Sequence, residues 1–365
     1  MTLHLYIARR FLFAFLAVFA GLFLMLALVD LVEQIRRFNA VEISFGALMA
    51  LTFLNVPESI YRILPLITIL AAIALFVNLS RNSELVIARA AGRAALTSVF
   101  APVFVAVALG ALGVAVLNPI VAATSKQYEV LADRYLGQRS SVLSVSPEGL
   151  WLRQGGETGQ TVIRAARANL DGTVLFEVTF LAFGEGGTPQ SRLEARQAEL
   201  RPGVWALQDA KEWTFGGGAN PEANAKLHEE FFVPTNLTRD EIADSFGTPS
   251  AIPIWELPGF IDRLEAAGFS ARQHKVWLQM EMALPVLLGA MVLVAAGFTL
   301  RPARFGRTGL MVVLALSLGF TLYFIRNFSQ ILGENGQVPV SLAAWGPPLA
   351  AALLPIGLLL HLEDG

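Results

Sequence analysis

Residues 94–125 read AALTSVFAPVFVAVALGALGVAVLNPIVAATS, a stretch of 32 residues without one charged side chain. A helix needs roughly 20 mostly apolar residues to cross a bilayer, and this stretch exceeds that length. The sequence contains five further charge-free runs that meet or approach it: residues 11–29, 63–80, 282–300, 308–325 and 338–360. We therefore predict six membrane-spanning helices, which agrees with a composition of 55% hydrophobic and only 15% charged residues.

A seventh charge-free run, residues 43–57, covers only 15 positions. That length suits a buried or interfacial helix, or the first part of a kinked span that leads into residues 63–80. A separate full span here would disturb the distribution of positive charge described below. We therefore expect no independent crossing from this run.

Most of the charge lies in one insert between the third and fourth predicted spans. Residues 126–281 hold 36 of the 56 charged residues. The chain thus divides into three parts: residues 1–125 with three spans, residues 126–275 as a polar domain, and residues 276–365 with three more spans. The fold class is a helical membrane protein with a large polar insert.

The insert has the patterns of antiparallel β structure. Strands are expected at residues 173–183, 192–200 and 204–215, with turns at Asp171-Gly172 and at Pro202-Gly203. Strict alternation in the first strand would place Val174, Phe176 and Val178 on one face, opposite Leu175, Glu177 and Thr179. We predict either a sandwich or a curled, open roll. A short helix over residues 255–268 should lead back to the membrane.

The arginines set the orientation, because cytoplasmic segments carry an excess of positive charge. With the N-terminus in the cytoplasm, eight arginines lie on the cytoplasmic side: Arg9, Arg10, Arg81, Arg89, Arg93, Arg301, Arg304 and Arg307. Only four lie in short segments on the other side: Arg36, Arg37, Arg62 and Arg326. Both termini are therefore expected in the cytoplasm and the β insert outside it.

Several kinds of chemistry have no sequence signal. The chain has no cysteine, no phosphate-binding G-x-x-x-x-G-K-[ST] loop, and four histidines without metal-ligand spacing. Its net charge of −2 gives no indication of nucleic-acid binding. No predicted span has an acidic residue at its centre, where an ion-coupled transporter often has one. We expect no metal or cofactor in this chain, and a role that is passive, structural or driven by a partner.

The loop after the second predicted span reads SELVIARAAG over residues 83–92. Ser83 suits a helix N-cap, Glu84 the positive end of a helix dipole, and Gly92 the position after the last turn. The loop is either a plain helical connector or a coupling helix that docks on a cytoplasmic motor. The candidate coupling residues are Ser83, Glu84, Leu85, Ile87, Ala88, Arg89 and Gly92. The loop with Arg301, Arg304 and Arg307 would flank them, although the positive charge expected on the cytoplasmic side also explains these three arginines.

The pattern of this loop resembles the coupling helix of the LptF/LptG permeases, the membrane subunits of the lipopolysaccharide-export ABC transporter. The resemblance extends over the whole chain. Further similar segments are residues 6–9 (YIAR), residues 30–37 (DLVEQIRR), Val56-Pro57 with Pro65, and residues 346–355 (GPPLAAALLP). The arrangement of three spans, a β insert and three spans is also similar. The first-span segment favours the LptG branch of the family.

The resemblance implies a permease subunit in the bacterial inner membrane that extracts lipopolysaccharide and passes it to a periplasmic bridge. It implies a β-jellyroll-like periplasmic domain. The implied partners are an LptF-like permease as heterodimer, an LptB-like ATPase dimer that binds ATP and Mg, an LptC-like single-span protein and an LptA-like bridge. The chain itself would be no enzyme.

The implied substrate contacts are charged residues near the outer ends of the spans. Arginine can hold the phosphates of lipid A bidentately, although arginines also simply anchor helices at the interface. The acidic candidates would repel a phosphate unless a divalent cation bridges them or Arg37 and Arg62 pair with Asp30 and Glu58. The candidates are Arg36, Arg37, Arg62, Asp30, Glu33, Glu58 and Arg326.

Two other function classes remain open on the residues alone. A mechanotransmission or lipoprotein-release permease usually has four spans, with the outer domain after the first. A non-transport scaffold or sensor would only display the β domain.

Overall fold

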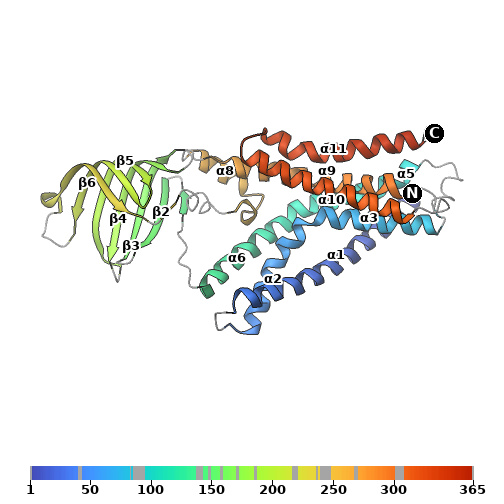
Figure 1. Cartoon of the computed structure of the whole chain (residues 1–365), viewed down its shortest axis with the longest axis horizontal. Coiled ribbons are helices and arrows are strands. Elements are labelled where there is room, and N and C mark those ends of the chain that lie inside the picture. Colours follow the sequence, from blue (N-terminus) through green and yellow to red (C-terminus); the bar gives the residue numbers. More distant parts are fainter. Residues whose placement is uncertain are drawn as a thin grey trace. The chain divides into compact units, whose positions relative to one another are not determined.

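The computed structural model describes residues 2–39, 43–82, 84, 95–136, 143–146, 149–156, 159–169, 172–184, 187–215, 221–235, 237–238, 248–266, 270–300 and 308–363. The chain forms two compact units (Figure 1). The helical unit comprises Met1–Leu136, Ser250–Trp255 and Arg272–Gly365. The β unit comprises Gly137–Pro249 and Glu256–Ala271.

Six helices within the described residues are long and apolar enough to cross a membrane, which confirms the predicted number. The helical unit is built from α1 (Thr2–Arg37), α2 (Phe45–Arg62), α3 (Leu64–Arg81), α5 (Ala95–Leu112), a π-helical turn η1 (Gly113–Leu117), α6 (Asn118–Leu136), α9 (Arg272–Thr299), α10 (Thr308–Glu334) and α11 (Val340–Glu363). The third candidate span runs from α5 through η1 into α6.

Helix α9 forms the centre of the helical unit. It packs against α3, α5, α10 and α11, and 72% of its most apolar window is buried. Gly110 of α5 permits one of these close approaches, because a Cβ atom there would lie 2.5 Å from the Pro285 Cα atom of α9. Small residues at helix contacts let backbones approach in this way.

The 43–57 run belongs to α2, which is a separate helix from α3. Ser44 caps α2 by accepting a hydrogen bond from the Ala47 amide, and α2 ends at Arg62. After Ile63, α3 begins with Pro65 in its first turn, where the missing amide proton costs nothing. Helix α2 is not among the six candidate spans, which agrees with the expectation that this run makes no independent crossing.

The helices extend past the charge-free runs that predict them. The fourth span was expected from residue 282, whereas α9 begins at Arg272. Glu281 therefore lies within a span, with only 1% of its surface exposed. A charge-free run ends at the first charged residue, whereas a helix continues through charges that find partners.

The β unit contains one antiparallel sheet of seven strands in sequential order. Its strands are β1 (Leu143–Ser146), β2 (Gly149–Gly156), β3 (Gly159–Ala168), β4 (Val174–Gly184), β5 (Pro189–Arg201), β6 (Val204–Thr214) and β7 (Lys226–Pro234). Among the described strands β1 does not pair with β7, so the sheet is open. The structure thus confirms antiparallel β structure and favours the open roll over the sandwich. A helix, α8 (Leu257–Ala266), follows as predicted.

The expected faces of β4 are wrong in one respect. Leu175 is buried together with Val178 and Phe180, although strict alternation places Leu175 opposite Val178. Glu177 between them has a positive φ of 53°, a left-handed conformation that interrupts the alternation. Asp209 of β6 also has φ 53°.

The neighbouring strands show the same interruption. In β5 the buried side chains step from Ala195 to Ala198, and in β3 they step from Ala165 to Ala168. At one level across β3, β4, β5 and β6, the alternation of buried and exposed side chains therefore shifts by one residue. Turn propensity in the sequence does not reveal this shift.

Candidate functional site

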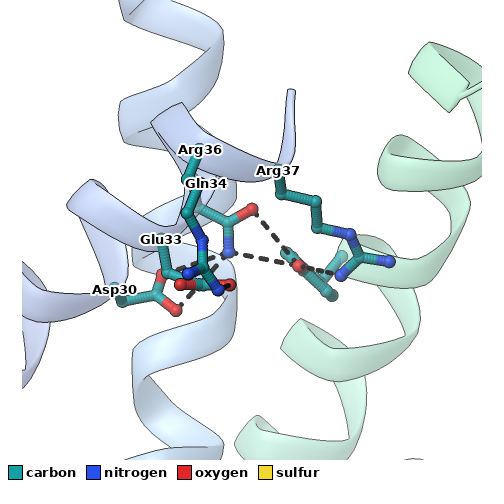
Figure 2. Close-up of polar contacts among 6 residues, drawn as sticks. Asp30, Glu33, Gln34, Arg36 and Arg37 are labelled. Atoms are coloured by element: carbon teal, nitrogen blue, oxygen red, sulfur yellow. Dashed lines mark hydrogen bonds and ion pairs between the residues drawn. The ribbon is translucent and has the colours of Figure 1, made fainter. Parts of the chain in front are cut away.

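The C-terminal end of α1 carries a cluster of polar residues, which we call the α1-end cluster: Asp30, Glu33, Gln34, Arg36 and Arg37. Figure 2 shows Gln34 and Arg37 reaching toward the neighbouring helix. Tyr128 of α6 is their shared partner, since Arg37 donates to the Tyr128 hydroxyl at 2.9 Å and the Gln34 amide lies 3.1 Å from it. Tyr128 therefore ties the end of α1 to α6.

The pair of Asp30 with Arg37, one of the alternatives expected from the sequence, does not form. The Oδ1 atom of Asp30 accepts a hydrogen bond from Asn55 of α2 at 2.6 Å, and Gln34 donates to both carboxylate oxygens at 3.3–3.4 Å. Neutral amides therefore hold the carboxylate of Asp30. Asp30 thus links α1 to α2 and leaves the charge of Arg37 available.

The two neighbouring arginines differ in their surroundings. Arg36 pairs with Glu33 one turn back at 2.8 Å, and 79% of the Arg36 side chain is exposed. Arg37 contacts the Tyr128 hydroxyl and lies over the Phe38 ring at 5.9 Å, and within the described residues no carboxylate forms an ion pair with it. Of the two arginines, Arg37 is therefore the one whose charge is not offset by a neighbouring carboxylate.

Glu58 and Arg62 form the expected pair on α2. Arg62 donates to Glu58 at 2.8 Å, and the other Glu58 carboxylate oxygen accepts from the Ser125 hydroxyl at 2.5 Å. Glu58 is thus neutralised within the chain. Both residues line a cavity of about 310 Å³ between α2, α6, α9 and α10.

Arg326 lies in this cavity and not in the α1-end cluster. Its side chain comes from α10 and is only 8% exposed. Glu281 of α9 shares the cavity and accepts hydrogen bonds from Tyr61 and, at 3.3 Å, from Asn118. The seven predicted substrate residues therefore separate into the α1-end cluster and a cavity group of Glu58, Arg62 and Arg326.

Glu84 is the described member of the predicted coupling loop. Its carboxylate accepts from Arg10 at 2.8 Å and from the Tyr6 hydroxyl at 3.1 Å, both on α1. The Arg10 guanidinium also lies 4.8 Å from the centre of the Tyr6 ring. The other coupling candidates lie outside the described residues: Ser83, Leu85, Ile87, Ala88, Arg89, Gly92, Arg301, Arg304 and Arg307.

Sequence reasoning missed the neutral partners that position these charges. Tyr128 and Asn55 carry no charge, so a search for charged residues near span ends passes over them. Asn118 holds two neighbours at once, since its Oδ1 atom accepts from the Ile254 amide at 2.9 Å while its Nδ2 atom donates to Glu281. The break in apolar character at Asn118-Pro119 was the one signal available. Within the described residues, His, Asp and Glu form no group of three that could hold a metal ion.

Comparison with known proteins decides the family. The family described as "Lipopolysaccharide export system permease LptF/LptG" matches residues 5–361, which covers both helical segments and the β insert between them. The chain belongs to the LptF/LptG family. Members of this family are permease subunits of the lipopolysaccharide export system, so the chain is a multi-pass transport subunit and not an enzyme.

Relatives support the same branch that the first span favoured. The chain is 26% identical over 351 residues to the lipopolysaccharide export system permease protein LptG of Escherichia coli (strain K12), covering 93% of this chain and 91% of that protein. It is 24% identical over 361 residues to the LptG protein of Haemophilus influenzae, covering 97% and 94%. The family membership also decides against the lipoprotein-release permease and the scaffold.

Proposed function

We propose that this chain is one of two permease halves that extract lipopolysaccharide from the inner membrane, driven by ATP hydrolysis in a partner subunit. The partners would be a second permease of the same family, an ATPase dimer that binds ATP and Mg, a single-span protein and a periplasmic bridge. The arginine distribution supports cytoplasmic termini and a periplasmic β unit.

The contact between Glu84 and α1 carries the mechanistic part of this proposal. Helix α1 has 36 residues, so it is about 54 Å long at 1.5 Å per residue. Glu84 contacts Arg10 near its start, and the α1-end cluster lies at its other end. A displacement of the inner loop would therefore pass along α1 to Arg37 without any intervening element.

The geometry changes the role expected for Glu84. Both of its carboxylate oxygens have partners within the chain, Arg10 on one and Tyr6 on the other. Glu84 thus acts as a positioning residue that fixes the loop on α1, while other loop residues would contact the ATPase. The pair is partly exposed, at 36% for Arg10 and 29% for Glu84, so its value lies in coupling rather than in stability.

A charge exchange tests this role. Glu84→Arg and Arg10→Glu each place like charges together, and each should lower ATP-driven release of lipopolysaccharide from proteoliposomes while the ATPase still co-purifies. The double variant restores opposite charges and should recover release. Arg9→Glu is the matched control, because Arg9 is exposed and has the Phe13 ring as its neighbour. A double variant as defective as the single ones would disprove the link.

The substrate contact follows from the unequal surroundings of the two arginines. We infer that Arg37 contacts a phosphate of the lipid, since a charge-assisted hydrogen bond is stronger than a neutral one. Arg36 contributes less because Glu33 already neutralises it. Asp30 serves to hold α1 on α2 and does not contact the phosphate directly.

A further inference from the structure

The cavity between α2, α6, α9 and α10 contains two hydrogen-bond donors that the chain leaves unused. Arg326 is 8% exposed and lines the cavity, and within the described residues Glu281 attracts it electrostatically without a hydrogen bond or close ion pair. The indole Nε1 atom of Trp277, which lines the same cavity, is buried without a partner. Buried donors without acceptors are costly, above all a guanidinium that cannot lose its charge.

Glu281 does not satisfy these donors. Its carboxylate attracts Arg326 electrostatically, yet its hydrogen bonds come from Tyr61 and Asn118. An acceptor from outside the chain would therefore complete both Arg326 and Trp277. An oxyanion fits best, because arginine and an indole N–H both recognise oxygen acceptors.

The depth of the cavity matches a lipid headgroup. The charge-free run 282–300 covers 19 residues, or about 28 Å of helix, and the hydrocarbon core is about 30 Å thick. Glu281 directly precedes this run, and Arg326 directly follows the run 308–325 on the next helix, α10. The charge-free runs therefore place both side chains where the apolar stretches stop, beside the headgroup region, while the two helices themselves continue further.

The charge of the cavity restricts the ligand further. Arg62 and Arg326 are balanced by Glu58 and Glu281, all four of which line it. A ligand with several negative charges would meet two carboxylates, whereas a phosphate that carries its own ammonium group would find a partner for each charge. The volume of about 310 Å³ is at the lower end of the range for small-ligand sites.

We propose that this cavity binds the phosphoethanolamine headgroup of a bilayer lipid. The phosphate would accept from Arg326 and Trp277, and the ammonium would lie on the side of the carboxylates. The site differs from the proposed substrate contact, because none of the residues of the α1-end cluster lines it.

Lipid retention measured by native mass spectrometry tests the proposal. The full chain, purified with its co-expressed partners, is reconstituted in nanodiscs that contain phosphatidylglycerol with either phosphatidylethanolamine or phosphatidylcholine. The wild type should retain one phosphatidylethanolamine adduct, and Arg326→Gln should lower that adduct about tenfold, as expected for a lost charged hydrogen bond. Trp277→Phe should lower it less, and Arg326→Lys should restore part of it.

Controls separate the possible sources of the ligand. Arg9→Gln removes an exposed arginine in the N-terminal part of α1, away from the cavity, and should leave the adduct unchanged. Excess free phosphoethanolamine should not displace the adduct if the acyl chains contribute, and its displacement would assign the site to the free headgroup instead. Thermal unfolding checks that Arg326→Gln folds. If that variant does not fold, the loss of the lipid adduct is measured on Trp277→Phe instead.

Three further results would overturn the proposal. One is the absence of any adduct in the wild type, which would mean a water-filled cavity. Another is an adduct that Arg326→Gln and Trp277→Phe leave unchanged. The last is a lipopolysaccharide adduct alone that Arg326→Gln removes, which would assign the cavity to the substrate path.

Discussion

Helices α1 and α9 are both long and strongly apolar, yet they have opposite environments. The mean hydropathy of their best windows is 2.8 for α1 and 2.1 for α9, while 6% and 72% of those windows are buried. Helix α9 presents small residues to its neighbours, among them Gly289, Ala290 and Ala295. Helix α1 exposes Leu24, Leu28 and Val32. The comparison teaches that hydropathy identifies a span, whereas side-chain size indicates whether protein or another apolar surface covers it.

The largest effect should follow from adding bulk at the α9 contact. In Gly110→Val the new Cβ atom would meet the backbone of Pro285 at 2.5 Å, and overpacking of this kind costs about 1–3 kcal/mol or more. The midpoint of thermal unfolding in detergent should fall clearly. Gly21→Val on α1 is the matched control, because nothing lies within 4 Å of its added Cβ atom. Equal loss in both variants would remove the distinction between the two helices.

A smaller effect should come from removing one hydroxyl at each helix. Tyr61→Phe deprives the buried Glu281 of a donor, which costs about 1–3 kcal/mol when the acceptor is shielded from water. Tyr128→Phe deprives Arg37 and Gln34 of a partner near the surface and should cost about 1 kcal/mol or less, since water replaces part of the contact. Chemical unfolding of both variants would measure the difference, and a greater loss in Tyr128→Phe would contradict it.

The exposed end of α1 should matter more for binding than for stability. Arg37→Ala should lower photocrosslinking to lipopolysaccharide about tenfold, the value of one charged hydrogen bond. Arg36→Ala should lower it less, because Glu33 already pairs with Arg36. Arg36→Ala should not shift the unfolding midpoint, and Arg37→Ala should lower it by no more than Tyr128→Phe does. If Arg36→Ala had the larger effect, the assignment based on the Glu33 pair would be wrong.

The smallest effect on stability is expected from a charged contact exposed to water, and it gives a lower reference value for the other substitutions. In the β unit, hydrogen bonds from Lys211 and then from Trp213 hold the pKa of Glu222 below its ordinary value of 4.5. A lowered folded-state pKa means that this contact stabilises the fold above about pH 4.5 and that the gain is lost as the pH falls through the lower folded value. Glu222→Gln should remove this slight pH dependence of the unfolding free energy, measured by chemical unfolding at several pH values and followed by circular dichroism.

The sequence predicts the spans well because lipid tolerates few charges and offers the backbone no hydrogen-bond partners, so a long charge-free apolar run indicates a helix. Helix ends are less predictable, since Glu281 stays inside α9 once Tyr61 and Asn118 donate to it. The α1-end cluster was found by its charges, but its geometry depends on neutral residues that no charge pattern reveals. In β4, alternation fails at Glu177 because one residue with positive φ reverses the faces.

The join at Ile63 has a mechanical consequence. Helices α2 and α3 form one nearly continuous segment, with a single residue between Arg62 and Leu64. Asn55, in the second half of α2, contacts Asp30 of α1, and Glu84, just beyond the end of α3, contacts Arg10 of α1. Helix α1 cannot slide along α3 without breaking one of the two contacts. A motion that keeps both contacts must therefore carry α1 and this segment together.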